Sequence, residues 1–491
     1  MNYHSTRNEQ LTASSTHAVL QGIAPDGGLY ICDPARLDFD WRAALEKSTL
    51  DMAADILHAL LPDFDDMPAL VRASYKDKFP TSDLTPLTPV ADKYVLELYH
   101  GPTSAFKDVA LSVLPHLIGA AAKAEGMKGD VVILTATSGD TGKAALDGFA
   151  GVKGCGVTVF YPEGKVSDIQ HLQMATQAGD NVAVCAVRGN FDDCQTEVKH
   201  IFADTALAKR LAEGGAVLSS ANSINVGRLA PQVTYYFDSY AQLVRAGAIE
   251  LGDEVTFCVP TGNFGDVLAG YYAKRLGLPV KKLVVASNEN DVLTDFLTTG
   301  TYNRLRPFNK TISPSMDILV SSNLERMLYY FCEGDCELVA SLMSDLAEKG
   351  SYTVPAEVLA RIQEVFACGR ADDDQTRAEI RSTWEGLGVL IDPHTAVAKT
   401  VLDSVERDGS VRVCLSTASP YKFGADVLAA LGEDTDNLTG FECMDALAAK
   451  TGTVPPARLS ALRDAEVLHT TVCDRDKMGD FAESSCARVF K

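Results

Sequence analysis

From about Tyr94 onward, the sequence alternates between short runs rich in β-branched residues and longer stretches rich in Ala and Leu. This alternation is typical of strands and helices that take turns in a parallel sheet. Several of the short runs are apolar throughout, which favours strands buried on both faces. We therefore predict an α/β fold, with strands at Tyr94–Tyr99, Val131–Ala136, Val157–Tyr161, Val182–Val187, Val255–Val259, Leu283–Ser287 and Val411–Leu415, and helices at Asp266–Leu276 and Leu324–Phe331.

Residues 1–93 differ from the rest of the chain because prolines interrupt a mostly helical pattern. We expect a separate, mostly helical N-terminal domain there, which ends in an extended linker at Phe79–Pro89. A chain of 491 residues has room for about three domains. The predicted division places the N-terminal domain at 1–93, a core with a small lobe (about 130–225) at 94–320, a helical segment packed on the core at 321–410, and a part that completes the large lobe at 411–491.

The charge balance is strongly acidic, with 66 Asp and Glu residues against 44 Lys and Arg, a formal net charge of −22. Nucleic-acid phosphates and anionic lipid repel such a chain, so we expect neither nucleic acid nor a membrane as a partner. The sequence also has no run of about 18 uncharged apolar residues that could span a bilayer. Anionic small molecules must therefore be bound locally, by backbone N–H groups and a few cations.

The 12 cysteines are scattered from Cys32 to Cys486. The closest pair, Cys332 and Cys336, lacks the two-residue spacing of common zinc or redox pairs, so no metal site is expected. The N-terminal stretch Met1–Gln10 is polar and lacks an apolar signal region. We expect a reduced, soluble protein of the cytoplasm.

In an open parallel sheet, ligands bind beyond the carboxyl ends of the strands, so the loops that follow strands are the places to look for functional residues. The first such loop, Tyr99–Asp108, leads into a predicted helix start at Lys107. The positive end of a helix dipole disfavours a cation, which lowers the pKa of the ammonium group and favours the neutral amine that a Schiff base needs. A solvated surface lysine is the alternative interpretation.

The second loop, Thr135–Lys143, offers hydroxyls and backbone N–H groups at a helix start. This combination is typical of an anion or carboxylate site, or of a plain capped helix. The loop does not match the nucleotide P-loop pattern, because Thr137 replaces the first Gly and Ala144 replaces the final Ser or Thr.

Three further segments carry polar groups that could bind a ligand. In Pro260–Asp266, Gly262 and Gly265 permit positive φ and close backbone approach, so that successive N–H groups could surround a phosphate. Ser416–Pro420 places hydroxyls after a strand, where they could also serve as turn and cap residues. Ser220–Arg228 supplies amides, a hydroxyl and a guanidinium suited to phosphate or carboxylate, or else forms a hydrogen-bonded seam between domains.

Together these segments resemble the threonine synthase family, whose members are pyridoxal-phosphate enzymes of fold type II, the tryptophan synthase β-like class. The long N-terminal segment is similar to that of the longer bacterial and fungal branch. The resemblance implies two parallel-sheet lobes beside a mostly helical N-terminal domain. It is carried by Ser5–Asn8, Gln21–Gly22, Asp26–Tyr30, His100–Asp108, Thr135–Gly142, Ala221–Arg228, Thr261–Asp266 and Thr417–Pro420.

The resemblance also implies roles for the matching residues. Lys107 is expected to carry pyridoxal 5′-phosphate as a Schiff base, and Thr417 to lie beside the ring nitrogen. Asp140 is expected beside the cofactor's 3-oxygen, where many relatives have Asn. The other expected cofactor contacts are Gly262, Asn263, Phe264, Gly265 and Asp266, and the expected substrate contacts are Ser138, Thr141, Asn222, Ser223 and Arg228.

The implied reaction converts O-phospho-L-homoserine and water to L-threonine and phosphate, the last step of threonine biosynthesis, in a monomer or homodimer. One alternative is another fold type II lyase, such as a dehydratase or a sulfur-amino-acid synthase. A dehydratase has no side-chain phosphate to bind, so the role of Arg228 separates the two activities. A second alternative is a non-catalytic relative that acts as a binding protein. The presence of Lys107, the glycine turn and Arg228 together argues against it.

Overall fold

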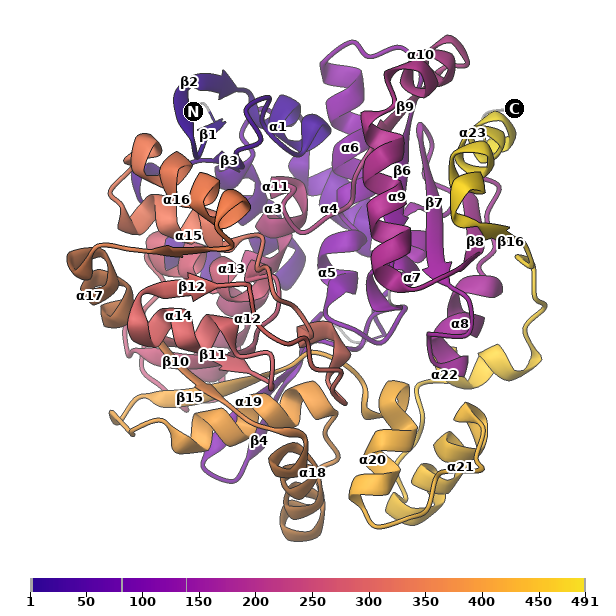
Figure 1. Cartoon of the computed structure of the whole chain (residues 1–491). Helices are drawn as coiled ribbons and strands as arrows, with labels where there is room; N and C mark the ends of the chain where they lie inside the picture. Colours follow the sequence, from indigo (N-terminus) through magenta and orange to yellow (C-terminus); the bar gives the residue numbers. More distant parts are fainter. Residues whose placement is uncertain (1–2, 81–82, 138, 490–491) are drawn as a thin grey trace.

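The structure is a computed structural model that describes residues 3–80, 83–137 and 139–489. Two sheets flanked by helices form its centre (Figure 1). In the large sheet all neighbouring strands run parallel except β4, which is antiparallel to β5. The strand order is β14 (Phe366–Arg370), β11 (Val280–Ser287), β10 (Val255–Pro260), β15 (Val411–Ser416), β5 (Lys93–Glu97) and β4 (Leu87–Val90).

The small sheet is parallel throughout. Each of the strands expected from the sequence corresponds to a strand of one of the two sheets, and the α/β fold class with two parallel-sheet lobes is confirmed. The order in the small sheet is β16 (Val472–Asp474), β8 (Val182–Arg188), β7 (Cys155–Pro162), β6 (Asp130–Ala136) and β9 (Ala216–Ser219).

Alternation along β6 explains why this strand is apolar on both faces. Val131 and Ile133 belong to the main hydrophobic core, whereas Val132 and Leu134 belong to a second core on the other face. Successive side chains of a strand point to opposite faces, so each face needs its own helical cover. Helices on the two faces supply it: α6 (Leu114–Ala124) and α7 (Asp140–Phe149) on one, α9 (Phe191–Ala203), α10 (Thr205–Glu213) and α23 (Met478–Val489) on the other.

The large sheet is covered in the same way. Phe257 and Val259 of β10 face the main core, while Cys258 packs with Val397 and Val401 on the opposite face. The helices that contact this sheet or each other around it are α12 (Val233–Arg245), α13 (Gly265–Arg275), α14 (Val292–Thr299), α17 (Ala356–Val365), α18 (Asp373–Leu387) and α19 (Pro393–Ser404). Each sheet is therefore a buried layer whose carboxyl edge stays available for loops.

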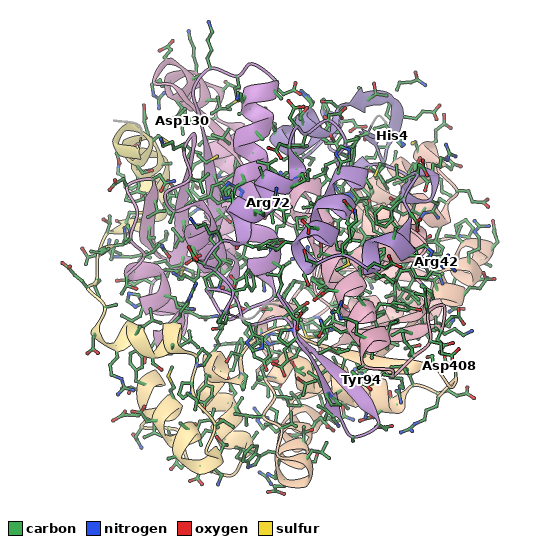
Figure 2. The ribbon with its side chains drawn as sticks, turned by 180° about the vertical axis from the view of Figure 1, so that it is seen from behind. His4, Arg42, Arg72, Tyr94, Asp130 and Asp408 are labelled. Carbon is green, nitrogen blue, oxygen red and sulfur yellow. The ribbon has the colours of Figure 1, made fainter. Side chains whose placement is uncertain are left out.

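The N-terminal part is mostly helical, but it begins with a small antiparallel sheet in the order β2 (Asn8–Ala13), β1 (Tyr3–Ser5), β3 (Tyr30–Ile31). Figure 2 shows this part, marked by His4, Arg42 and Arg72, from behind. The Tyr75 hydroxyl donates to the Val109 carbonyl at 2.8 Å, which ties it to the core. Its helices are α1 (Ser15–Gln21), α2 (Trp41–Leu45), α3 (Thr49–Leu60) and α4 (Met67–Tyr75).

The sequence predicts a helical segment at residues 321–410, but the structure has strands there as well as helices. They include α15 (Leu324–Phe331) and α16 (Cys336–Glu348), but also β13 (Ser351–Thr353) and β14. β14 pairs in parallel with β11 and so becomes the edge of the large sheet. Its sequence, Phe-Ala-Cys-Gly-Arg, lacks β-branched residues, so local propensity does not indicate a strand and the pairing partner decides.

Residues 411–491 do not all complete the large lobe. β15 does, but β16 pairs with β8 at the edge of the small sheet, and α23 packs on that sheet, where the hydroxyls of Thr158 and Ser485 are 2.9 Å apart. β16 has only three residues, too few to show the alternation of a strand. The sequence therefore does not indicate that the chain returns to the small sheet. Between them lie α20 (Gly424–Ala430), α21 (Gly440–Thr451) and α22 (Ala457–Ser460). In the described part of the chain, no helix is long and apolar enough to cross a membrane.

Candidate active site

Two loops that follow neighbouring strands of the large sheet meet around Lys107. Helix α5 (Lys107–Leu111) begins at this residue, as the sequence predicts. The backbone N–H of Phe106 donates to the carbonyl of Thr417 at 2.8 Å, and that of Ser419 donates to Ser104 at 3.1 Å. The first and fourth candidate loops are therefore side by side, because β5 and β15 are paired strands that end at the same edge.

The Lys107 amine is buried among charged groups. Its side chain is 10% exposed, and its nitrogen lies 3.8 Å from Oδ2 of Asp140. Burial lowers the pKa of Lys107, and Arg228 and Lys422 act in the same direction, whereas Asp140 and Asp266 oppose them. Because the neutral amine is the nucleophilic form, this environment suits a lysine that attacks a carbonyl group.

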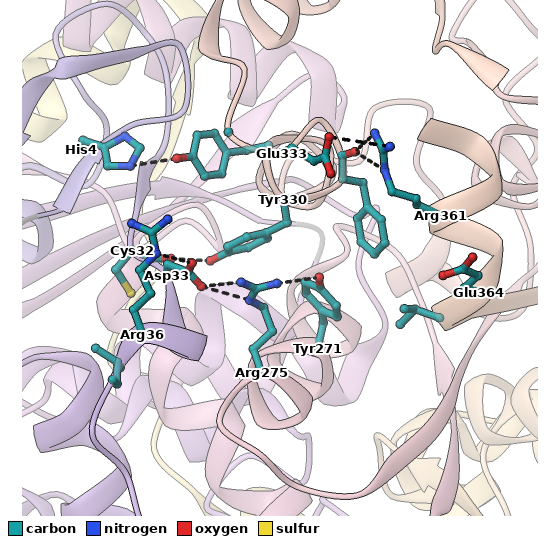
Figure 3. A pocket seen from close by; sticks show the side chains of 15 residues that line it. His4, Cys32, Asp33, Arg36, Tyr271, Arg275, Tyr330, Glu333, Arg361 and Glu364 are labelled. Carbon is teal, nitrogen blue, oxygen red and sulfur yellow. Dashed lines mark hydrogen bonds and ion pairs between the residues drawn. The ribbon is translucent and has the colours of Figure 1, made fainter. Parts of the chain in front are cut away.

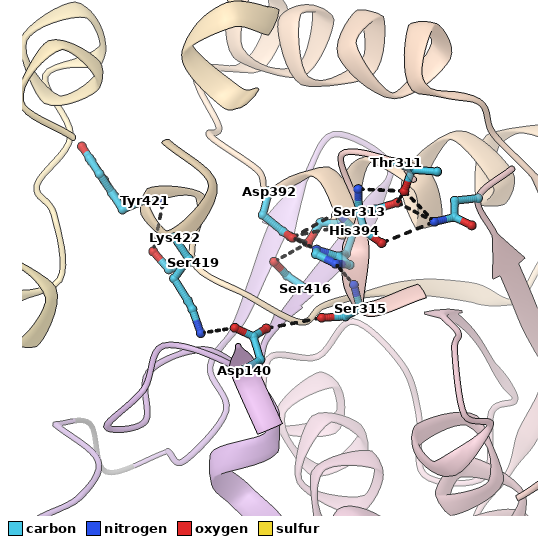
Figure 4. Close-up of polar contacts among 12 residues, drawn as sticks. Asp140, Thr311, Ser313, Ser315, Asp392, His394, Ser416, Ser419, Tyr421 and Lys422 are labelled. Carbon is cyan, nitrogen blue, oxygen red and sulfur yellow. Dashed lines mark hydrogen bonds and ion pairs between the residues drawn. The ribbon is translucent and has the colours of Figure 1, made fainter. Parts of the chain in front are cut away.

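Asp140, the first residue of α7, lies between the two lobes of the molecule (Figure 4). Its Oδ1 is 2.6 Å from the Lys422 ammonium and accepts from Nε2 of Gln170 at 3.0 Å. The Ser315 hydroxyl donates to Oδ2 at 3.4 Å. Burial alone would raise the pKa of Asp140, but Lys422 and Lys107 outweigh it and hold the pKa well below its usual range. Asp140 is therefore a buried, ionised carboxylate.

The glycine turn follows β10 and leads into α13. Gly262 and Gly265 do not adopt the left-handed conformation that the sequence suggested; instead Phe264 does, with a φ of 61°. Gly262 is needed for close approach, because a Cβ there would lie 2.7 Å from the Ser315 carbonyl oxygen. In the described part of the chain, the N–H groups of Gly262, Asn263 and Phe264 donate to no acceptor. Unpaired donors at the start of a long helix form an anion site.

Asp266 lies in the first turn of α13 with its side chain buried. Its Oδ1 accepts from the N–H of Val267 at 2.9 Å. Burial raises the pKa of Asp266 to about 7, although this backbone hydrogen bond and Lys107 lower it. Asp266 therefore keeps its proton to a higher pH than an ordinary aspartate, unlike Asp140.

The segment before α11 (Val226–Leu229) lies next to the glycine turn. A Cβ on Gly265 would be 3.8 Å from Cβ of Ser223. Arg228 is buried, and one of its terminal nitrogens donates to the Ala221 carbonyl at 2.7 Å. Burial lowers the pKa of Arg228 to about 10, so the guanidinium stays charged at neutral pH. Asn222 is exposed at the rim of this segment.

Not every polar residue of the candidate loops is free to bind a ligand. The Thr137 hydroxyl accepts from the N–H groups of Gly139 and Gly142 at 3.0 and 2.9 Å, so it closes the turn before α7. Thr141 is half-buried in the first turn of α7. Ser138 lies outside the described residues.

Several residues of the site could not be recognised in the sequence. Lys422 and Gln170 reach Asp140 from other parts of the chain, and Asn323 bridges the carbonyls of Ser223 and Asn263 at 3.0 and 3.2 Å. The only sequence signal for Lys422 is its place five residues after Thr417, in the loop after a strand. For Gln170 and Asn323 there is no such signal, because long-range packing brings them in.

The buried pair Asp392 and His394 lies next to the site and contacts the backbone of Ser315 (Figure 4). Nδ1 of His394 is 2.6 Å from Oδ2 of Asp392, and Nε2 accepts from the backbone N–H of Ser315 at 3.1 Å. A ring nitrogen that accepts cannot carry a proton, so the proton lies on Nδ1, toward Asp392. The pair fixes Ser315, whose carbonyl covers Gly262.

A cavity of about 620 Å³ lies elsewhere, between the N-terminal part and α13, α15 and α17 (Figure 3). None of the charged groups around Lys107 lines it. Its arginines are already engaged: Arg275 binds Asp33 and Tyr271, and Arg361 donates to the carbonyl of Phe331. The Lys107 cluster is therefore the better candidate for chemistry. Within the described residues, no group of three or more His, Cys, Asp or Glu could hold a metal ion.

The comparison with protein families agrees with this geometry. The model "Pyridoxal-phosphate dependent enzyme" matches residues 84–415, and the model "Threonine synthase N terminus" matches residues 2–75. The first match covers both sheets' central strands, Lys107 and the glycine turn. With the two parallel-sheet lobes, it defines the class as pyridoxal-phosphate dependent enzymes of fold type II.

Individual relatives narrow the class. The chain is 39% identical to threonine synthase of Schizosaccharomyces pombe over 473 residues, which covers 89% of this chain and 90% of the relative. The crystal structure of PLP-bound threonine synthase from Brucella melitensis matches with a TM-score of 0.88 and 36% identity, over 100% of both chains. The chain belongs to the threonine synthase family.

One group of relatives is longer than this chain. Threonine synthase-like 1 of Homo sapiens is 36% identical over 483 residues, which is 94% of this chain. The chain spans 64% of the length of that relative and of the proteins of the same name from Pongo abelii and Macaca fascicularis.

Proposed function

We propose that this chain converts O-phospho-L-homoserine and water to L-threonine and phosphate. The observation that carries the proposal is the presence of two separate anion-binding devices around one buried lysine: the unpaired N–H groups of the glycine turn, and Arg228. A cofactor phosphate and a substrate phosphate require two phosphate sites, whereas a dehydratase, whose substrate carries a carboxylate but no phosphate, requires only the one for the cofactor. The family match and the threonine synthase relatives support the same reaction.

The residues present suit pyridoxal phosphate. Lys107 offers a buried amine whose lowered pKa favours the neutral form that binds an aldehyde. The N–H groups of Gly262, Asn263 and Phe264, together with Gly265 at the helix start, would hold the phosphate without a cation. The 2.7 Å clearance at Gly262 leaves no room for a side chain in this turn.

Three side chains would contact the ring of the cofactor. Thr417 would lie at the ring nitrogen, where a neutral hydroxyl does not force protonation. Asp140 would lie at the 3-oxygen, on the side from which Lys422 approaches. Asp266, whose pKa is raised by burial, would lie between the phosphate turn and Lys107.

When bound, pyridoxal phosphate supplies a conjugated system that delocalises negative charge from the substrate's Cα. The chain itself would move the protons: the Lys107 amine would take protons from Cα and Cβ and would return protons to Cγ and Cα. Phosphate would leave from Cγ, which becomes the methyl group, and water would add its hydroxyl at Cβ while its remaining proton balances the released phosphate. Ser138, Thr141, Asn222, Ser223 and Arg228 would bind the carboxylate and phosphate of the substrate, with Arg228 as the bidentate partner.

The two lobes would close over the substrate to exclude water until Cβ is ready to react. We further propose that the protein works in the cytoplasm as a monomer or homodimer. Light scattering at micromolar concentration measures the oligomeric state, and a trimer or larger assembly would contradict this part.

The test of the proposed function is a two-product assay on the purified protein with O-phospho-L-homoserine. We expect inorganic phosphate and L-threonine in equal amounts, and only when pyridoxal phosphate is bound. Release of 2-oxobutyrate and ammonia without threonine would instead identify a dehydratase. No phosphate release from a protein that shows the lysine-bound absorption band would contradict the proposal.

A further inference from the structure

Asp140 and Lys422 form a buried ion pair that joins the two lobes. Asp140 begins α7 beside the small sheet, and Lys422 belongs to the loop after β15 of the large sheet (Figure 4). The Lys422 side chain is 0% exposed, that of Asp140 is 6% exposed, and their charged atoms are 2.6 Å apart. Water therefore screens neither charge.

The two oxygens of Asp140 face different partners. Oδ1 receives Lys422 and Gln170, while Oδ2 faces Lys107 at 3.8 Å and Ser315 at 3.4 Å. Without Lys422, a full negative charge would face the lysine amine and would hold it as ammonium. With Lys422 in place, its ammonium offsets part of the effect of the carboxylate on Lys107, since Asp140 raises and Lys422 lowers the pKa of that lysine.

We propose that Lys422 is a positioning residue that holds Asp140 in a buried ion pair and offsets part of its charge, so that Lys107 and the cofactor face a weakened negative charge. An aspartate can then occupy a position where many type II enzymes have the neutral asparagine. The inference rests on Lys107 as the cofactor-binding lysine, but it does not depend on the substrate proposed above.

The alternative is that Lys422 only fills space or ties the lobes together. A purely structural lysine would change stability without changing the protonation of Lys107. The charged groups that face Lys107 are Asp140, Asp266, Arg228 and Lys422, so a change of charge at Lys422 must appear in the pH behaviour of Lys107.

The test measures the pH midpoint of the visible absorption band that the lysine-bound cofactor gives, in the holoenzyme without substrate. In Lys422→Met, the unpaired Asp140 carboxylate stabilises the protonated form, so the midpoint rises by about one pH unit. In Asp140→Asn, the unpaired Lys422 ammonium lowers it. The double variant D140N/K422M carries neither charge, and its midpoint lies between those of the two single variants.

The matched control is Lys143→Met. Lys143 is also a buried lysine of α7, but it donates to Gln177 and not to Asp140, so its loss leaves the midpoint unchanged. A midpoint in K422M equal to that of the native protein overturns the proposal.

Thermal unfolding of the cofactor-free protein provides a second readout. Each single variant leaves one buried charge without its partner and lowers the midpoint of unfolding by several degrees, whereas D140N/K422M regains most of the loss. Where K422M does not fold, the comparison of D140N/K422M with D140N remains. A double variant no more stable than D140N overturns the proposal, while an absent band in the native protein would instead contradict Lys107 as the cofactor lysine.

Discussion

The glycine turn and the Asp140 cluster lie at the same active site, but they handle charge in opposite ways. The turn Gly262–Gly265 offers unpaired N–H groups and no charged side chain. The Asp140 cluster assembles full charges, with Lys107 and Lys422 on either side of a carboxylate. The turn is local in the chain, whereas the cluster joins residues more than 280 positions apart, since Asp140 and Lys422 come from different lobes.

The two regions show how an acidic protein can bind anions. With a net charge of −22, the chain cannot rely on its overall field, so backbone dipoles and single buried cations must do the binding. Backbone N–H groups give affinity for a phosphate whatever the pH. Buried side-chain charges give a site whose protonation can be adjusted, as the opposite pKa directions of Asp140 and Asp266 illustrate.

The largest effect is expected from Lys107, the lysine that both regions surround. Replacement of Lys107 by Ala should lower kcat by about 10⁴-fold, because the proton-transfer group at Cα and Cβ is lost. The absorption band of the lysine-bound cofactor should disappear as well. Lys143→Ala, a buried lysine of the neighbouring helix, should keep both band and activity. A band that persists in K107A would show that another lysine binds the cofactor.

The next largest effect is expected at Arg228, which is proposed to bind the substrate phosphate through its side chain. Arg228→Met should lower kcat/KM for O-phospho-L-homoserine by about 100-fold, the value of a charge-assisted bidentate hydrogen bond. Arg228→Lys should recover part of this loss, because it restores the charge without the fork geometry. Cofactor affinity should stay as in the native protein. Equal kcat/KM for native and R228M protein would show that Arg228 does not bind the substrate phosphate.

A smaller effect is expected in the glycine turn, which offers backbone N–H groups. In Gly262→Ala, the new methyl group would meet the Ser315 carbonyl at 2.7 Å, so the turn must shift. Cofactor affinity, measured by equilibrium titration of the cofactor-free protein, should weaken by about tenfold. The control is Gly386→Ala in α18, where no atom beyond the neighbouring residues and the helix's own backbone lies within 4 Å of the added methyl group. Unchanged affinity in G262A would mean that the turn does not hold the phosphate.

The smallest effect concerns the pH dependence of stability. The pKa of Asp266 is about 7 in the folded protein and lies near its ordinary acidic value in the unfolded chain, so the folded state binds the proton more tightly. Its contribution to stability is therefore present at acidic pH and is lost as pH rises toward 7. Asp266→Asn should remove this loss.

The measurement is thermal unfolding of the cofactor-free protein at pH 5 and pH 8. At each pH we take the unfolding temperature of D266N minus that of the native protein. This difference should be a few degrees larger at pH 8 than at pH 5. A difference between variant and native protein that is the same at both pH values would contradict the raised pKa of Asp266.

The sequence predicts the local half of this site well. Helix α5 begins at Lys107, α15 has the predicted limits Leu324–Phe331, and the glycine turn follows its strand as expected. Patterns of two and 3.6 residues and turn chemistry are local properties, so one sequence is enough to recognise them. The left-handed residue of the turn was misplaced, because glycine is the usual carrier of positive φ and Phe264 takes it here.

The non-local half could not be predicted. Lys422, Gln170 and Ser315 reach Asp140 only after both sheets have formed and the loops at their carboxyl edges have met. Likewise, β14 and β16 are strands because β11 and β8 offer free edges, not because of their own composition. Long-range pairing overrides weak local propensity in both cases.

The measurement that tests the proposed function most directly is the fate of the water oxygen. In water labelled with oxygen-18, cleavage of the Cγ–O bond releases phosphate with its four original oxygens, and the β-hydroxyl of threonine acquires one labelled atom. Mass spectrometry of both products should therefore find the label in threonine and none in phosphate. Label in phosphate, with homoserine as the second product, would show hydrolysis of the P–O bond and contradict the proposed reaction.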